Sequence, residues 1–254
     1  MDYFAKNIQV FEDTRHLSQT RFIKFTEHSK MNTNVIADAG KDIDIYKNTD
    51  QSIILVPCGT IQAVINNHNE KNKVAILNFA DALMPGGLVK TGANTQEECI
   101  CRCSNIYECL IQDVCDKEYY GFNDNLEDVT YSNRLIYSED VLIFKDESYD
   151  LIANPFTADV ISCPAPVHCK DMTIWEDRIK CILASAANHN CDTIILGAWG
   201  CGAFGNSAEI VATAFKNVLN EYKLFNKVIF AIRPVDRSDK ADNYDVFRRV
   251  IKGV

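Results

Sequence analysis

The 254-residue sequence lacks the features that would place it in a membrane or on a secretion route. No apolar run approaches the roughly 20 residues of a membrane-spanning helix. The first residues, Met-Asp-Tyr-Phe-Ala-Lys-Asn, lack the basic and then apolar layout of a signal peptide. No internal repeat or low-complexity tract occurs either. We therefore expect a globular protein of the cytoplasm, with the nucleus as an alternative location.

Positive charge is also scarce. Lys and Arg number 26 against 35 Asp and Glu, which gives a formal net charge of −9. Nucleic-acid surfaces need clustered Lys and Arg to neutralise phosphates, so we expect no DNA or RNA surface, and we expect no membrane contact. An anionic small ligand would have to be held by local backbone donors. The expected oligomeric state is a monomer.

Cysteine is abundant, but the spacing of a metal site is missing. None of the eleven cysteines forms a Cys-x-x-Cys pair, although five of them cluster between Cys99 and Cys115. Zinc sites rely on such pairs, so we expect no metal, and the sequence indicates no cofactor. In an intracellular protein these cysteines would be reduced thiols that are buried as small hydrophobic side chains.

What the sequence does contain is an alternation of predicted strands and helices from Ser52 onward. Strands are expected at 52–56, 74–79, 134–138, 141–144, 159–162, 193–199 and 227–232. Helices are expected at 59–69, 97–115 and 244–251, and from Thr173 and Asn206, where a Glu three residues later completes a capping-box spacing. This alternation predicts an α/β fold whose sheet is covered by helices on both faces.

Two parts of the chain fit this rhythm poorly. In residues 1–50 we expect one or two amphipathic helices between 9 and 25 and a polar, irregular segment at 32–50. Residues 119–134 form an acidic and aromatic segment that we expect to be a loop region. We therefore expect an N-terminal accessory segment at 1–50 and the main domain at 51–254.

The most informative stretch runs from Pro85 to Glu98, between the expected strand 74–79 and the expected helix 97–115. It contains three glycines, and two adjacent glutamates open the helix. Glycine lets a backbone approach a ligand closely, and a helix N-terminus presents unpaired N–H groups to an anion. Two carboxylates there indicate acid–base chemistry beside a phosphate-bearing ligand. The alternative is that Glu97 and Glu98 only complement the helix dipole.

This block resembles the signature of the bacterial-type poly(ADP-ribose) glycohydrolases, a family with a macrodomain fold. The matching segments are Asn78-Phe79-Ala80, Pro85-Gly86-Gly87, Gly92-Ala93 and Gln96-Glu97-Glu98. The likeness spans roughly residues 70 to 251. It implies a macrodomain-like α/β/α sandwich with a mixed central sheet in residues 51–254, and an N-terminal, mainly helical extension.

The resemblance also implies roles for individual residues. Glu98 would be the acid that protonates the leaving ribose oxygen and later activates water, while Glu97 would hold a ribose hydroxyl. The residues that the resemblance places against substrate are Asn78, Asp81, Gly86, Gly87, Leu88, Gln96, Ala165, Gly200, Cys201, Gly202, Ala203 and Phe204. The reaction would require no metal. The substrate would be poly(ADP-ribose) or ADP-ribosylated protein, and the product ADP-ribose.

Two positions differ from the family's usual residues: Leu88 replaces a third glycine, and Asp81 replaces a second asparagine. If position 88 requires a positive φ, the leucine is strained there, and Leu88→Gly should raise activity. The alternative is that the Leu88 side chain fills a pocket, in which case glycine would weaken binding.

A second glycine loop, Gly200-Cys-Gly-Ala-Phe-Gly205, lies between an expected strand and an expected helix. It matches the dinucleotide motif G-x-G-x-x-G, so a nicotinamide-dependent oxidoreductase competes as a function. A Rossmann half needs further βαβ units, and only about fifty residues follow the motif. The same chemistry suits a loop that wraps a diphosphate with backbone N–H groups. The resemblance implies this, and it packs Phe204 against the distal ribose, although Phe204 could also belong to the core.

Three functions follow from the sequence. The resemblance favours a glycohydrolase that cleaves ribose–ribose O-glycosidic bonds and releases ADP-ribose, mainly from chain ends. The second is an ADP-ribose reader or a hydrolase of mono-ADP-ribosylated protein. The third is the oxidoreductase indicated by the second glycine loop.

Overall fold

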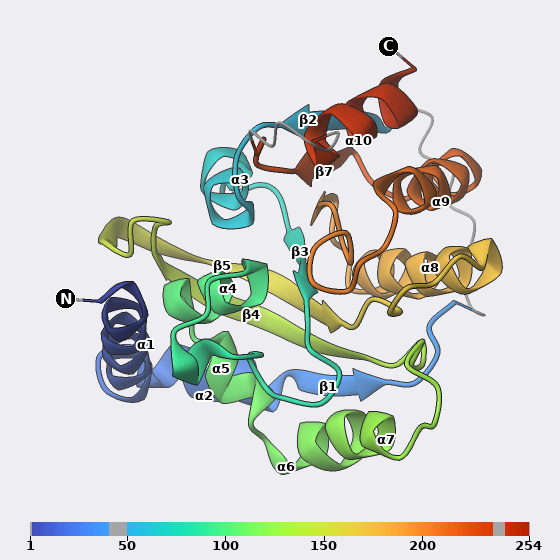
Figure 1. Ribbon diagram of the computed structural model, residues 1–254. Coiled ribbons are helices and arrows are strands. Elements are labelled where there is room, and N and C mark those ends of the chain that lie inside the picture. The colour runs from blue at the N-terminus through green and yellow to red at the C-terminus, as the bar shows by residue number, and fades with distance from the viewer. Residues whose placement is uncertain (1, 41–49, 236–241, 254) are drawn as a thin grey trace. The chain divides into compact units, whose positions relative to one another are not determined.

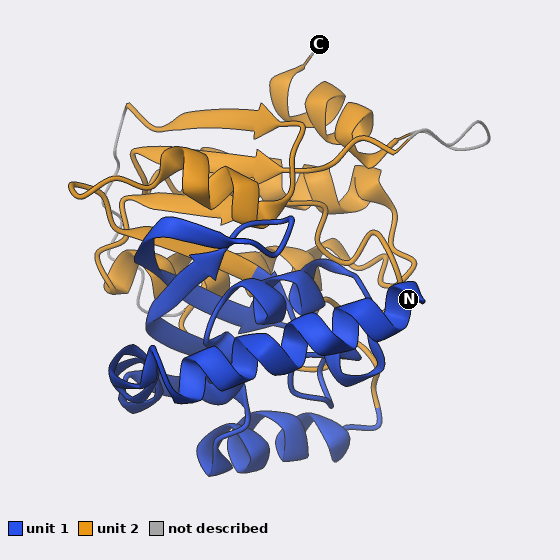
Figure 2. Cartoon of the chain, turned by 90° about the vertical axis from the view of Figure 1, so that its left-hand side faces the viewer, with its two compact units in different colours: residues 1–37, 78–127, 134–164 blue, residues 38–77, 128–133, 165–254 orange. Residues whose placement is uncertain are grey.

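The computed structural model describes residues 2–40, 50–235 and 242–253. They belong to two compact units (Figure 2). Unit 1 contains residues 1–37, 78–127 and 134–164, and unit 2 contains residues 38–77, 128–133 and 165–254. Residues 41–49 of the expected irregular segment lie outside the described residues. Within the described ranges, no helix is both long and apolar enough to cross a membrane.

Unit 1 combines an antiparallel sheet with a series of helices (Figure 1). Its strands lie in the order β1-β4-β5, with Thr33 paired to Ser138 and Ile136 paired to Ser162. The strands are β1 Thr33–Ile36, β4 Leu135–Lys145 and β5 Leu151–Cys163. The helices are α1 Tyr3–Gln19, α2 Ile23–Met31, η1 Val89–Thr91, α4 Gln96–Cys103, α5 Ile106–Leu110, α6 Asp113–Cys115, η2 Asp116–Tyr120 and α7 Gly121–Asp124.

The single helix predicted for 97–115 is wrong, because the chain leaves the helix after Cys103 and continues as the short helices α5 and α6. The Ser104 hydroxyl bonds the carbonyl of Ile100 and accepts from the N–H of Ile106, so it competes with the helical ladder. The Asn105 Oδ1 accepts from the N–H of Leu142 in β4 at 2.9 Å. A tertiary contact therefore ends a helix that its apolar spacing would continue.

Two further predictions for unit 1 are corrected. The start of the expected irregular segment 32–50 contains β1, because residues Thr33–Ile36 pair with β4. The start of the expected loop 119–134 is helical instead, in η2 and α7. There the Tyr119 hydroxyl donates to the carbonyl of Asp81 at 3.4 Å, and the Asn123 amide donates to the carbonyl of Ala82 at 3.4 Å.

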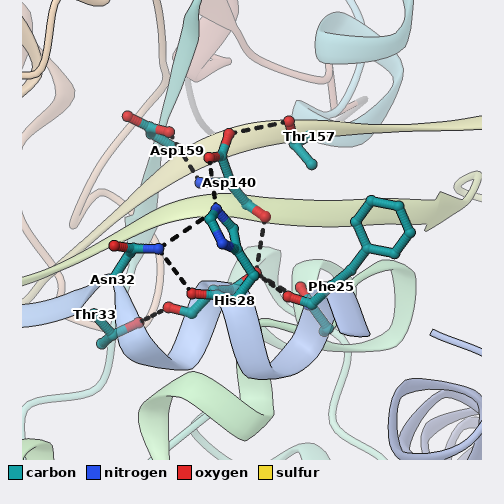
Figure 3. Close-up of polar contacts among 9 residues, drawn as sticks. Phe25, His28, Asn32, Thr33, Asp140, Thr157 and Asp159 are labelled. Atoms are coloured by element: carbon teal, nitrogen blue, oxygen red, sulfur yellow. Dashed lines mark hydrogen bonds and ion pairs between the residues drawn. The ribbon is translucent and has the colours of Figure 1, made fainter. Parts of the chain in front are cut away.

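The two strands predicted at 134–138 and 141–144 form one strand, β4, with an irregularity between Ser138 and Val141. Asp140 lies in this irregularity with φ +52°. Its carbonyl accepts from the Ser29 hydroxyl of α2 at 2.8 Å, and its Oδ2 lies 3.1 Å from Nε2 of His28 (Figure 3). Its Oδ1 accepts from the Thr157 hydroxyl of β5 at 3.2 Å. One bulged residue thus ties helix α2 to both long strands.

Unit 2 contains a parallel arrangement of strands in the order β3-β6-β7-β2. Its strands are β2 Ser52–Val56, β3 Val74–Phe79, β6 Thr193–Leu196 and β7 Lys227–Ala231, and its helices are α3 Thr60–Asn67, α8 Met172–Asn188, α9 Ala208–Glu221 and α10 Asn243–Lys252. The last two residues of β3, Asn78 and Phe79, are counted with unit 1. The predicted strands at 52–56 and 74–79 are confirmed without change.

The helix starts predicted in unit 2 are displaced by one or two residues. Asp171 is the N-cap of α8, because its side chain accepts from the N–H of Thr173. Ser207 precedes α9, and the Asn206 side chain bonds loop backbone instead of capping the helix. In both cases another short polar residue occupies the cap position, two residues upstream of Thr173 in α8 and one residue downstream of Asn206 in α9.

An aromatic series forms the core of unit 2. Trp175 and Trp199 pack edge to face with ring centroids 5.4 Å apart, and Phe215, Phe230 and Phe247 continue the series. These rings come from α8, α9, α10, β7 and the residues after β6. Helices and strands of unit 2 are therefore joined by apolar contacts, as the α/β prediction requires.

Helix α1 packs within unit 1 by one buried aromatic side chain. Phe11 is fully buried and contacts Tyr107 of α5 edge to face, with centroids 4.9 Å apart. We expect Phe11→Ala to lower the free energy of unfolding by about 3–5 kcal/mol, since it leaves a cavity. Denaturant unfolding measures this loss. Phe4→Ala on the same helix is the matched control, because that side chain is exposed. Equal effects of the two variants would contradict the packing of α1.

Candidate active site

The chain leaves β3 through a short turn that its own side chains stabilise. Asp81 Oδ1 accepts from the N–H groups of Leu83 at 2.7 Å and Met84 at 3.0 Å. The N–H of Gly87 then donates to the carbonyl of Met84 at 3.0 Å. Only the side-chain oxygen of position 81 is used here. An asparagine would supply the same oxygen, so aspartate in its place leaves the turn intact.

Glu98 is fixed at the start of α4 by three hydrogen bonds. Its Oε2 accepts from the N–H of Thr95 at 2.8 Å and from the Thr95 hydroxyl at 2.5 Å. Its Oε1 accepts from the N–H of Leu88 at 3.0 Å, and the side chain is buried with 4% exposed. Thr95 and Glu98 form a capping box, so the carboxyl group joins the helix start to the glycine turn.

Glu97 is equally well anchored and has an altered acidity. Its Oε1 accepts from the amide of Asn78 at 3.3 Å, and its Oε2 accepts from the N–H of Asp81 at 2.8 Å. Burial, with 2% exposed, raises the pKa of Glu97 well above its ordinary value, and the charge of Glu98 adds to this rise. The N–H of Asp81 acts in the opposite direction. Glu97 therefore retains a proton at a pH where an exposed glutamate is ionised.

Asn78, at the end of β3, has one open hydrogen-bond acceptor. Its amide donates to Glu97 and, at 3.0 Å, to the Ser162 hydroxyl of β5. Its Oδ1 is buried and finds no hydrogen-bond partner among the described residues. Buried polar atoms are nearly always paired in native proteins, so this oxygen indicates a place for a donor from a ligand or from water.

The glycine turn lies directly against the carboxyl pair. Gly87 has φ +57°, and a Cβ there would lie 2.7 Å from Oε1 of Glu98 and 3.0 Å from Oε2 of Glu97. Gly86 has φ +70°, and a Cβ there would lie 2.9 Å from the ring of Tyr107. Both positions need glycine for conformation and for space.

Leu88 is not strained. Its φ is −97°, its side chain is 49% exposed, and its N–H bonds Glu98. The suggestion that this position requires a positive φ is wrong. The expected gain of activity from Leu88→Gly depended on relief of backbone strain, and there is no such strain to relieve.

Gln96 serves as a link between elements. Its Oε1 accepts from the N–H of Phe79 at 2.9 Å and so ties the start of α4 to the end of β3. The structure thus brings one group of the predicted residues together in unit 1. The group consists of Asn78, Asp81, Gly86, Gly87, Leu88, Gln96, Glu97 and Glu98. Their contacts with substrate stay a prediction.

The other predicted residues lie in unit 2, where Ala165 follows β5 and Gly200 to Phe204 belong to the loop between β6 and α9. Gly200 has φ +74°, and a Cβ there would lie 2.6 Å from the Cβ of Ala165. The Asn206 amide donates to the carbonyls of Pro166 at 2.7 Å and Gly200 at 2.9 Å, and its Oδ1 accepts from the N–H of Cys169. This asparagine therefore fixes both ends of the loop.

The middle of that loop is open. Gly202 has no atom within 4 Å of a Cβ position, and Ala203 is exposed. Phe204 is half-buried, and its carbonyl accepts from the N–H of His168 at 3.1 Å. Burial raises the pKa of the Cys201 thiol to about 12, so this cysteine stays neutral and does not serve as a nucleophile.

Three further residues bond these two groups in roles that the sequence analysis did not assign to them. Thr95 had a local signal, because Thr-x-x-Glu from 95 to 98 is the capping-box spacing. Ser162 and Asn206 had none that points to their role, since each bonds residues that are distant in the sequence.

Comparison with known proteins identifies the family. Residues 7–146 match the family model described as microbial-type PARG, catalytic domain. The match covers more than half of the chain, so the chain belongs to this family of poly(ADP-ribose) glycohydrolases. No curated protein matches the sequence significantly. The membership makes the protein a glycosidase that acts on poly(ADP-ribose), and it counts against the oxidoreductase alternative.

Solved structures of bacterial members show the same fold. The chain is 25% identical to poly(ADP-ribose) glycohydrolase from Thermomonospora curvata bound to the inhibitor ADP-HPD, with a TM-score of 0.85 and coverage of 96% of this chain and 99% of that chain. It is 26% identical to the enzyme from Deinococcus radiodurans in complex with ADP-ribose, with a TM-score of 0.82 and coverage of 90% and 97%. The predicted macrodomain-like mixed α/β fold is confirmed. The predicted boundary at residue 50 stays a prediction.

The contact between Gly87 and the carboxyl pair gives a direct test of this geometry. We expect Gly87→Ala to lower turnover about 100-fold, because the added Cβ must displace Glu98 or the turn, and misplacement by 1 Å has about that effect. Gly253→Ala is the matched control, since Gly253 also has a positive φ but has open space around its Cβ position. Steady-state release of ADP-ribose measures both. A Gly87→Ala protein with more than half of wild-type turnover contradicts the geometry.

Proposed function

We propose that the protein cleaves ribose–ribose O-glycosidic bonds of poly(ADP-ribose) with Glu98 as the general acid, and that it releases ADP-ribose mainly from chain ends. The observation that carries the assignment of the acid is the buried carboxyl group of Glu98, held between the glycine turn and the start of α4. The Deinococcus relative was solved in complex with ADP-ribose, the unit that cleavage at a chain end releases, and this supports the preference for ends.

Glycosidic cleavage needs a proton on the leaving oxygen while positive charge develops on the ribose carbon. The Glu98 carboxyl donates this proton, and its carboxylate then takes a proton from the attacking water. The N–H groups of Leu88 and Thr95 hold the carboxyl group in one place during both steps. A fixed donor raises the rate because the reactants need no further ordering.

Glu97 has the companion role of holding a ribose hydroxyl. Burial and the neighbouring carboxylate raise the pKa of Glu97, so the pair resists carrying two negative charges. A protonated or shared carboxyl group can both accept a hydrogen bond from a hydroxyl and donate one to it. Asn78 orients Glu97 through its amide, and its free Oδ1 accepts from a second hydroxyl. Asp81 contributes through its backbone and the turn that it closes.

In unit 2, we assign the loop from Gly200 to Phe204 to the diphosphate of the ligand. The loop leads into the N-terminus of α9, and helix N-termini favour anions. With a net charge of −9, the protein gives no general attraction for a diphosphate, so local backbone donors must hold it. The half-buried Phe204 then packs against the distal ribose.

We also propose a location in the cytoplasm. None of the eleven cysteines, which all lie among the described residues, forms a disulfide, and eight of them are buried. Cysteines outside disulfides persist as thiols in a reducing compartment, which supports an intracellular location.

Matched glutamine variants separate the two carboxylates. We expect Glu98→Gln to lower turnover on defined polymer by about 10²–10⁴-fold, the usual contribution of a general acid, and to leave the affinity for ADP-ribose within a few-fold. We expect Glu97→Gln to weaken ADP-ribose binding as well. Release of ADP-ribose and calorimetric titration measure the two effects.

Two outcomes would contradict the assignment. A Glu98→Gln protein with more than about a third of wild-type turnover shows that Glu98 is not the acid. A Glu97→Gln protein that loses turnover but binds normally shows that the two roles are exchanged. Mono-ADP-ribosylated protein serves as the comparison substrate, and faster cleavage of it than of polymer contradicts the proposed substrate.

A further inference from the structure

The segment 92–95, between η1 and α4, determines where Glu98 lies. Its last residue, Thr95, supplies two of the three hydrogen bonds to the Glu98 carboxyl. Any movement of this segment therefore moves the proposed acid. Two buried side chains that are not among the proposed substrate contacts, Arg102 and Asn7, hold the segment.

Arg102, on helix α4, holds the segment 92–95 by hydrogen bonds. Its Nη1 donates to the carbonyl of Ala93 at 2.8 Å, and its Nη2 donates to Oδ1 of Asn94 at 2.5 Å. The guanidinium lies 5.1 Å from the ring centre of Tyr149, whose hydroxyl also donates to Oδ1 of Asn94 at 2.9 Å. Arg102 is 0% exposed, and its Nε has no hydrogen-bond partner among the described residues.

Burying the charged side chain of Arg102 lowers the stability of the folded protein. A buried charge normally requires an ionised partner, and both oxygens that Arg102 bonds here are neutral. A flexible apolar residue would fill the same space without that cost, but it would leave the carbonyl of Ala93 and the amide of Asn94 without these donors. The arginine is therefore best explained by the two oxygens that it holds in a fixed geometry.

Helix α1 holds the same segment from the other end. The Asn7 amide donates to the carbonyl of Gly92 at 2.9 Å. Gly92 has φ +84°, and a Cβ there would lie 2.4 Å from the carbonyl oxygen of Phe4. The backbone of the segment 92–95 therefore packs directly against the backbone of α1. The Tyr3 hydroxyl bonds Asn94, and the Thr14 hydroxyl donates to the carbonyl of Arg102 at 2.7 Å.

The spacing of Glu98 and Arg102 along α4 connects the hydrogen bonds of Arg102 to the position of the proposed acid. Glu98 and Arg102 are four residues apart, so they lie on one face of the helix, one turn from each other. Glu98 bonds Thr95, and Arg102 bonds the two residues before it. One helix thus holds three consecutive residues of the segment with two side chains.

We propose that Arg102, assisted by Asn7, is a positioning residue for Glu98, and this proposal rests on the proposed function. Arg102 acts by fixing Ala93 and Asn94, which fixes Thr95 and so the Glu98 carboxyl. It has no contact with substrate in this account. Helix α1, in the segment expected to be accessory, is therefore part of the catalytic apparatus.

The test compares Arg102→Met, Arg102→Lys and Asn7→Asp with the wild-type protein. We expect Arg102→Met to lower kcat on polymer by about 10–100-fold, since misplacement of a reacting group by 1 Å has an effect of this size. The affinity for ADP-ribose should change less than about three-fold, because substrate contacts remain. Arg102→Lys keeps the positive charge but loses the planar guanidinium that donates to two oxygens at once, so it should give an intermediate kcat. Asn7→Asp replaces a donor by an acceptor opposite the Gly92 carbonyl and should also lower kcat.

Two further variants separate positioning from loss of stability. Phe215→Leu removes a fully buried ring from the core of unit 2, whereas the segment 92–95 belongs to unit 1. It should lower the Tm and leave kcat unchanged. In a Glu98→Gln background, Arg102→Met should cause no further loss of the residual activity, because the residue acts only through Glu98.

Three results would overturn the proposal: an unchanged kcat in Arg102→Met, an equal fold-loss of kcat in the wild-type and Glu98→Gln backgrounds, or an equal loss of kcat in Phe215→Leu. The proposed function itself fails if the wild-type protein releases no ADP-ribose from polymer. In that case a crystal structure of Arg102→Met decides the positioning claim alone. Displacement of Thr95 and the Glu98 carboxyl supports it, and an unmoved segment contradicts it.

Discussion

The structure of unit 1 depends on one carboxyl group that is both a helix cap and the proposed acid. Glu98 accepts from the N–H groups of Thr95 and Leu88, so the start of α4 and the glycine turn are held by the side chain that we propose as the acid. This double use leaves no room for a Cβ at Gly87. It also requires the segment before α4 to be fixed, which explains a buried arginine and an N-terminal helix at that segment.

How far the sequence predicts the fold depends on how local the determining contacts are. Strands β2 and β3 are continuous apolar or β-branched runs, and both were predicted with the observed ends. The break in the expected helix 97–115 was not predicted, because it depends on a bond from Asn105 to distant Leu142. Strand β1 forms only through its pairing with β4, and the helical turn η2 is held by a bond from Tyr119 to Asp81. The spacing of apolar residues along the sequence does not indicate which distant residues will form these hydrogen bonds and strand pairs.

The candidate site follows the same rule. Glu97, Glu98 and the two glycines were found because the motif is contiguous, and Thr95 could have been found from its spacing to Glu98. Arg102 and Ser162 could not, since their importance comes from neighbours that the fold supplies. Leu88 shows another limit of the sequence. A family preference for glycine leaves open whether the position requires a positive φ, and the structure shows that it does not: the backbone there is ordinary, and its N–H bonds Glu98.

The central claim, that Glu98 delivers the proton to the leaving oxygen, is tested most directly by changing the leaving group. An ADP-ribose glycoside of p-nitrophenol needs little protonation, and azide as nucleophile needs no general base. The account predicts that the ratio of wild-type to Glu98→Gln turnover falls from about 10²–10⁴ on polymer to roughly 10 or less on this substrate with azide. An equal ratio on the two substrates would contradict the account, because Glu98 would then act on something other than the leaving oxygen.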